Sequence, residues 1–249
     1  MSLRSFPTSW LTATVLLTGL LASPTAAALP PLKDVIAPAK PLVASEELAD
    51  QLYPVGFSPR GAFAFLEISA DEAVGCTLWG FTIVDLVTDR VVFRDDWNAH
   101  GQVDCKEQLD LEQVWARHSA RFRKALLEHD VQPTHPGRLT RFPLERGGEV
   151  FTVRLERGLP RKNDIDGKDL PINVFVTSSV RGSKRIGDLV ERDMAGMPMT
   201  YGHTVMGFIP SPHEPRVVVV IREEQRGWEG PPDVLTYKLM GASLTKGFR

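Results

Sequence analysis

Alternating apolar and polar residues along most of the chain predict a protein built mainly of β-strands. Residues 151–156 alternate strictly, so their three apolar members are expected to face a core. Residues 172–177, 217–221 and 235–239 are short apolar or β-branched runs of the kind buried within sheets. Together with the hairpins below, the pattern predicts about eight to ten strands.

Two hairpins are expected early in the chain. Pro59 and Gly61 form a tight turn before a strand at residues 62–68, and residues 81–87 pair with residues 90–93. The sequence Gly-Phe-Ser-Pro at residue 56 recurs as Gly-Phe-Ile-Pro at residue 207, again before a strand. We interpret this echo as two related hairpins.

One long amphipathic helix is predicted at residues 106–129, where Leu111, Trp115, His118, Phe122, Leu126 and His129 recur at helical spacing. Asp104 followed by Glu107 is the expected N-cap and its capping-box partner. A second, short helix is expected at residues 184–194. The predicted fold class is therefore α+β, mainly antiparallel sheet in a sandwich or in blade-like hairpins.

The first 28 residues have the layout of a secretory signal peptide. Arg4 precedes an uncharged apolar run at residues 10–22, and small residues at 25–28 follow Pro24. The run is shorter than the ~20 residues that span a bilayer. We expect a soluble periplasmic or extracellular protein with no membrane contact after cleavage, a proline-rich tether at residues 29–45 and a single domain at residues 46–249.

Composition narrows the functional classes. Apolar residues make up 43% of the chain and charge is nearly balanced, with 29 basic and 31 acidic residues, so an intrinsically disordered chain is excluded. The balance also provides no general attraction for nucleic acid. The expected partner is an envelope protein or a small molecule.

An exported chain places Cys76 and Cys105 in an oxidising compartment, so the two are predicted to form a disulfide. The alternatives are two unpaired structural thiols, or a reactive Cys105 in the first turn of the helix capped by Asp104. No Cys-x-x-Cys motif is present.

Catalytic and metal motifs are scarce, and no cofactor is expected. The sequence has no G-x-S-x-G elbow and no H-E-x-x-H zinc helix. Residues 163–169 have the glycine of a calcium loop but lack the carboxylates expected at both ends, so an acidic turn is favoured. The six histidines are scattered, which argues against a metal site. Basic residues at 138–162 fit a solvated sheet face, with an anion-binding groove as the alternative.

The loop at residues 226–232 is the strongest candidate for a ligand-binding site. Trp228 lies between glycines and prolines, directly after the apolar strand at residues 217–221. Trp228 with Glu229 and His203 is the tentative ligand-binding set. A buried Trp228 that closes the end of the core is the structural alternative.

The sequences GFSPRGAFAFLE (residues 56–67) and GWEGPPDVLTYKL (residues 227–239) resemble the opening and closing segments of a family of predicted secreted bacterial proteins of unknown function. The chain departs from that family's glycine-rich segment at residues 69–79. The resemblance implies a secreted domain and supplies no catalytic residues.

We therefore expect a non-enzymatic ligand- or protein-binding domain of the cell envelope. The alternative is a secreted hydrolase with its site around the Trp228 loop, where His203, Glu229 and Asp233 are the candidate residues. A stabilising subunit of an envelope complex is a third hypothesis.

Overall fold

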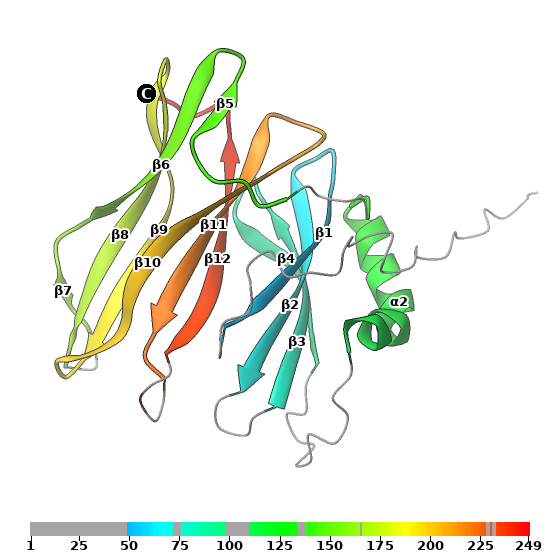
Figure 1. The fold of residues 1–249 in the computed structure, drawn as a ribbon, viewed down its shortest axis with the longest axis horizontal. Helices are drawn as coiled ribbons and strands as arrows, with labels where there is room; N and C mark the ends of the chain where they lie inside the picture. The colour runs from blue at the N-terminus through cyan, green and yellow to red at the C-terminus, as the bar shows by residue number, and fades with distance from the viewer. Residues whose placement is uncertain are drawn as a thin grey trace, which may run out of the picture.

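The computed structural model describes residues 49–71, 76–97, 110–133, 138–164, 166–227, 230 and 233–249. The fold is mostly antiparallel β, as predicted, with a single helix in these ranges (Figure 1). No helix in this part of the chain is long and apolar enough to cross a membrane.

The first sheet has four antiparallel strands in sequence order: β1 (Gln51–Phe57), β2 (Ala62–Asp71), β3 (Cys76–Asp85) and β4 (Arg90–Trp97). Both predicted hairpins are confirmed. At the first turn Gly61 has φ +89°, and the Ser58 hydroxyl accepts hydrogen bonds from the backbone N–H groups of Arg60 and Ala62. These contacts reverse the chain sharply.

Helix α2 (Leu111–Glu128) packs on one face of this sheet, where Trp115, Phe122 and Leu126 join the core. The predicted helix is confirmed, but it begins at Leu111 and not at residue 106. Asp110 is the N-cap, and it forms a reciprocal capping box with Gln113. The predicted cap residues, Asp104 and Glu107, lie outside the described residues.

The second sheet runs in the order β12-β11-β10-β9-β8-β6-β5, with β7 paired to β8. Its strands are β5 (Leu144–Arg146), β6 (Glu149–Arg157), β7 (Arg161–Lys162), β8 (Lys168–Ser178), β9 (Gly182–Met194), β10 (Met197–Pro210), β11 (Arg216–Gln225) and β12 (Val234–Ser243). The helix predicted at residues 184–194 is wrong, because this segment is β9 and pairs along its length with β8. Met194, at the end of this segment, is 40% exposed.

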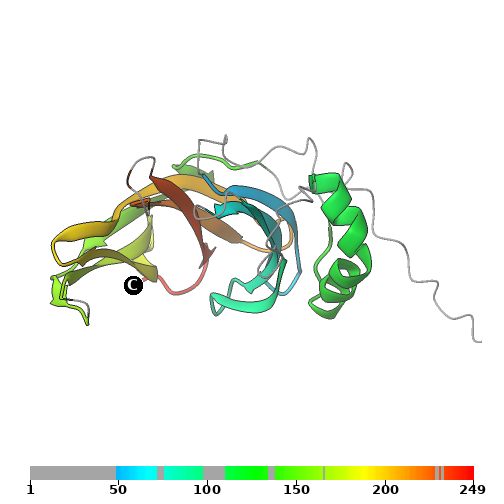
Figure 2. The ribbon, with the colours of Figure 1, turned by 90° about the horizontal axis from the view of Figure 1, so that it is seen from below.

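The eight-stranded sheet curves back on itself (Figure 2). β9 pairs with β10 only near their shared turn, from Met194 to Arg192 on β9. Farther along β9, Gly187 lies so close to β12 that an added Cβ would be 2.9 Å from the sulfur of Met240. Two layers of one sheet therefore face each other.

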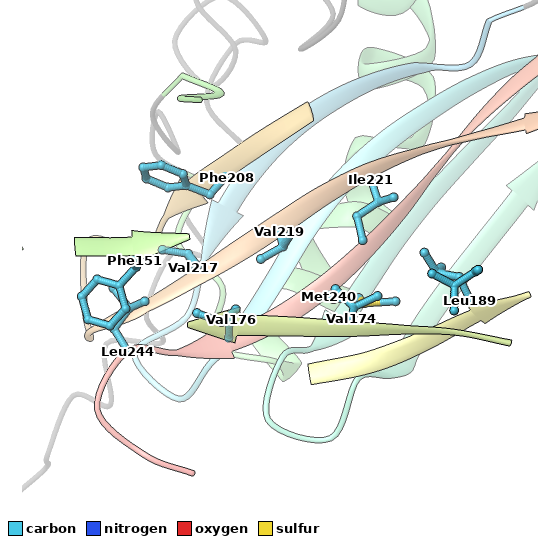
Figure 3. Close-up of a cluster of buried hydrophobic side chains, with 12 residues drawn as sticks. Phe151, Val174, Val176, Leu189, Phe208, Val217, Val219, Ile221, Met240 and Leu244 are labelled. Carbon is cyan, nitrogen blue, oxygen red and sulfur yellow. The ribbon is translucent and has the colours of Figure 1, made fainter. Parts of the chain in front are cut away.

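The space between these layers is filled by apolar side chains (Figure 3). Val217, Val219 and Ile221 of β11 contribute to the same buried cluster as Val174 and Val176 of β8. Phe151 is also buried in it, as predicted, with Val153 and Leu155 of β6 packed alongside. The opposite face of β11 packs on the four-stranded sheet through a further cluster.

The Gly-Phe echo has a structural counterpart. Gly56 and Gly207 each lie at a β-bulge. An added Cβ would be 1.9 Å from the carbonyl oxygen of Gln132 at Gly56, and 2.3 Å from that of Thr140 at Gly207. The phenylalanine that follows each glycine forms a backbone hydrogen bond to the residue that the glycine approaches. Phe57 bonds to Gln132, and Phe208 bonds to Thr140. The segments that follow α2 thus contact one hairpin in each sheet through equivalent bulges.

Candidate functional site

His203, the described member of the predicted ligand-binding set, lies on β10 with its side chain only 1% exposed. Trp228 and Glu229 lie outside the described residues, as do the predicted signal peptide, the tether and Cys105. The side chain of Cys76 is also outside them, so the disulfide stays a prediction. Asp233, from the hydrolase alternative, accepts a hydrogen bond from the Tyr201 hydroxyl, which raises the pKa of Tyr201 to about 12.

The buried neighbours of His203 are two carboxylates on the adjacent strands. Its Nε2 is 3.1 Å from Oε2 of Glu223 on β11, a hydrogen-bonding distance. Its Nδ1 is 3.9 Å from Oε1 of Glu191 on β9 and has no hydrogen-bond partner among the described residues. The two carboxylates approach opposite nitrogens of the ring, so the three groups do not converge on one point as metal ligands would.

Glu223 is fixed by contacts to both of its oxygens. Oε1 accepts a hydrogen bond from Gln225 at 2.6 Å and lies 3.5 Å from Nζ of Lys238 on β12, while Oε2 faces His203. Burial acts to raise the pKa of Glu223. The hydrogen bonds from His203 and Gln225 and the charge of Lys238 outweigh burial and hold that pKa at about 2.

The ionic contacts extend across the inner face of the curved sheet. Arg157 on β6 donates to Oε1 of Glu191 at 3.0 Å. We call the resulting series Arg157, Glu191, His203, Glu223 and Lys238 the charged row. Its members come from five strands, β6, β9, β10, β11 and β12, and His203 lies between the two carboxylates.

A hollow of about 530 Å³ lies between β9 and β12, beside the charged row. We call it the β9–β12 hollow. Leu189, Val190 and Met240 give it apolar walls, and Thr200, Glu223 and Lys238 add polar groups. Its volume falls within the range of about 300–1,000 Å³ that is usual for small-molecule sites.

Most of the charges around the hollow are already engaged. Arg192 donates two hydrogen bonds to Asp169, and Asp188 is 2.8 Å from Arg185. Lys238 differs, because its contact with Glu223 spans 3.5 Å and its side chain is 46% exposed. The Lys238 ammonium is therefore the cation in the hollow best able to meet an added molecule.

Two other segments singled out in the sequence, the turn at residues 163–169 and the basic segment at residues 138–162, make contacts within the fold. In the turn at residues 163–169, the Asn163 amide donates to Asp169 and to the backbone of Asp193, and its oxygen accepts from Gly167. This agrees with the turn interpretation. Within the described ranges, no group of three or more His, Cys, Asp or Glu side chains is arranged to hold a metal ion. In the basic segment, Arg154 pairs with Glu156 and covers the Phe175 ring.

Comparisons with protein-family models, with curated proteins and with solved structures find no match to this chain. The resemblance of residues 56–67 and 227–239 to a secreted family remains a prediction.

Sequence reasoning missed Glu191, Glu223 and Lys238. A signal was present for Glu223, which continues the inward-facing positions 217, 219 and 221 at a spacing of two. A carboxylate at a position where the pattern expects an apolar side chain marks a buried polar site. Nothing in the local sequence of Glu191 or Lys238 indicates their neighbours, which come from distant strands.

Proposed function

We propose that this chain is an exported, non-enzymatic binding domain of the cell envelope, and that it binds a small molecule in the β9–β12 hollow. The observation that carries the proposal is a hollow of about 530 Å³ in which apolar walls surround the fixed carboxylate of Glu223 and the ammonium of Lys238. Small-molecule sites typically combine such walls with a few well-placed polar groups.

The fixed position of Glu223 in the hollow also supports a binding role. Glu223 is held through both oxygens, so it needs no rearrangement before a ligand arrives. Binding to a site that is already ordered costs less conformational entropy than binding to a mobile one. Export rests on the signal-peptide pattern of the first 28 residues.

A ligand-observed NMR screen of metabolites and fragments tests this proposal. Thr200→Phe fills the hollow from β10 with a large side chain. Thr204→Phe is the matched control, because Thr204 is an exposed residue of the same strand and does not line the hollow. We expect ligands that bind the wild type and Thr204→Phe but not Thr200→Phe. No ligand, or equal binding to all three proteins, would contradict the proposal.

A secreted hydrolase is the second candidate, favoured by the hydrogen bond between His203 and Glu223. A carboxylate that orients an imidazole is a common arrangement in hydrolytic sites. Screening esterase, phosphatase and glycosidase substrates against the wild type and His203→Gln tests this candidate. Turnover that the variant abolishes would favour it over the binding role, whereas turnover that survives in the variant would remove His203 from it.

A further inference from the structure

The Nδ1 atom of His203 is a buried polar atom with no hydrogen-bond partner among the described residues. It lies 3.9 Å from Oε1 of Glu191, which is too far for a hydrogen bond. That oxygen already accepts a hydrogen bond from Arg157 at 3.0 Å. The ring and Glu191 therefore face each other across a short gap without a bond between them.

Glu223 determines which ring nitrogen carries the hydrogen of a neutral His203. The pKa of Glu223 is about 2, so its carboxylate is ionised at neutral pH and can only accept hydrogen bonds. Nε2, which lies 3.1 Å from Oε2 of Glu223, is therefore the N–H donor. In the neutral ring Nδ1 then has a lone pair that faces the Glu191 oxygen, and two acceptors cannot bond to each other.

His203 and Glu191 lie where β9 and β10 separate. The last backbone pair between the two strands joins Arg192 to Thr200. Glu191 is the next residue of β9, and His203 lies three residues farther along β10. Beyond this point, Leu189 of β9 lines the β9–β12 hollow. A bond between His203 and Glu191 would therefore hold this wall of the hollow against β10.

We propose that His203 takes up a proton at Nδ1 and that the resulting imidazolium closes on Glu191, joining β9 to β10 and β11. Histidine is the side chain that ordinarily gains a proton between about pH 8 and 5. The charged ring is paired on both sides, by Glu191 and Glu223, which is the condition under which a buried charge is tolerated. Charge-assisted N–H···O bonds are about 2.8 Å long, so the gap to Glu191 shortens by about 1 Å.

The charges around the ring leave room for one more positive charge. Glu191 of β9 and Glu223 of β11 face the ring, and Arg157 of β6 and Lys238 of β12 contact these two carboxylates from the other side. In the part of the chain that the structure describes, no other carboxylate lies at ion-pair distance from the ring. With a neutral ring the two acidic and two basic groups balance, and the proton gives the charged row a net positive charge.

As it concerns ligand binding, this inference rests on the proposed function. The wall of the hollow on β9 is held at low pH and released at high pH. A small molecule in the hollow therefore binds more tightly at low pH, because less conformational freedom is lost when the wall is already fixed.

NMR of the ligand-free protein tests the inference. Long-range ¹H–¹⁵N correlation spectra report which ring nitrogens of a histidine carry hydrogen, and His203→Gln assigns the His203 signals. In the wild type we expect hydrogen on Nε2 alone at about pH 8 and on both nitrogens at about pH 5. The backbone amide of Leu189 should shift with the same midpoint, and this shift should be absent in His203→Gln.

Glu191→Gln removes the carboxylate charge and nearly preserves the shape of the side chain, so the midpoint of the His203 titration should move to lower pH. Asp188→Asn is the matched control, because Asp188 is also on β9 but pairs with Arg185, and it should keep the wild-type midpoint. A ring that keeps one protonation state from about pH 5 to 8, or the same midpoint in Glu191→Gln as in the wild type, would overturn the inference.

The measurement needs no ligand, so it separates the two proposals. A titrating His203 in a protein that binds no small molecule would refute only the proposed function.

Discussion

His203 on β10 and Glu223 on β11 form a buried hydrogen bond, with Nε2 and Oε2 3.1 Å apart. The register of the two strands sets these residues directly opposite each other. Buried polar groups are costly unless they are paired, and this hydrogen bond pairs one nitrogen of the ring with one oxygen of the carboxylate. The pair also anchors the charged row beside the hollow.

Replacing Glu223 with Gln should destabilise the protein in a pH-dependent way. The pKa of Glu223 is about 2 in the folded protein and 4.5 without these contacts, so its stabilisation is present above pH 4.5 and disappears as the pH falls toward 2. The shift corresponds to about 3 kcal/mol at pH 7. Urea unfolding of both proteins between pH 3 and 7 measures the difference, which should shrink toward low pH.

Glu224→Gln is the control for that experiment. Glu224 is the next residue of β11, and its ion pair with Arg222 is partly exposed. Such pairs contribute less than about 1 kcal/mol to the free energy of unfolding. An equal loss of stability in both variants would show that the network around Glu223 has no special role.

Gly207→Ala should be strongly destabilising. Its added Cβ would be 2.3 Å from the Thr140 carbonyl oxygen, and Gly207 has φ +148°. Strain at such a position costs about 1–3 kcal/mol before any displacement of Thr140. Thermal unfolding of Gly147→Ala gives the reference, because Gly147 has φ +58° but no atom within 4 Å of an added Cβ. Equal melting temperatures for the two variants would exclude the close approach.

Asp110→Ala should lower the free energy of unfolding by about 1 kcal/mol, the usual value of an N-cap. The loss arises because the N–H groups of the first helical turn lose the Asp110 carboxylate. Glu112→Ala, an exposed position in the same turn, should cost only a few tenths of a kcal/mol. If chemical denaturation gave the opposite order, the assigned start of α2 would be incorrect.

Thiol titration tests the predicted pairing of Cys76 with Cys105. Protein purified from an oxidising compartment and unfolded without reductant should have almost no free thiol. Prior reduction should release two thiols per chain, which is the positive control. Two free thiols without reduction would show that the disulfide does not form.

The hairpins and buried strands could be predicted because a spacing of two between apolar residues is a local signal. β9 could not, because its apolar residues at 186, 189 and 190 also fit a helical spacing, and only pairing with β8 decides the outcome. The residues of the candidate site are still harder to predict. Glu191, His203 and Glu223 lie on three strands, and the sequence alone does not state the register that brings them together.

Mapping a bound ligand by protein-observed NMR tests the central claim most directly. The best small molecule from the screen is titrated into ¹⁵N-labelled protein. We predict that the largest shifts fall on the amides of Leu189, Thr200, Lys238 and Met240, which line the hollow from three strands. Shifts confined to α2 and the four-stranded sheet, with these four amides unchanged, would contradict the assignment of the β9–β12 hollow as the binding site.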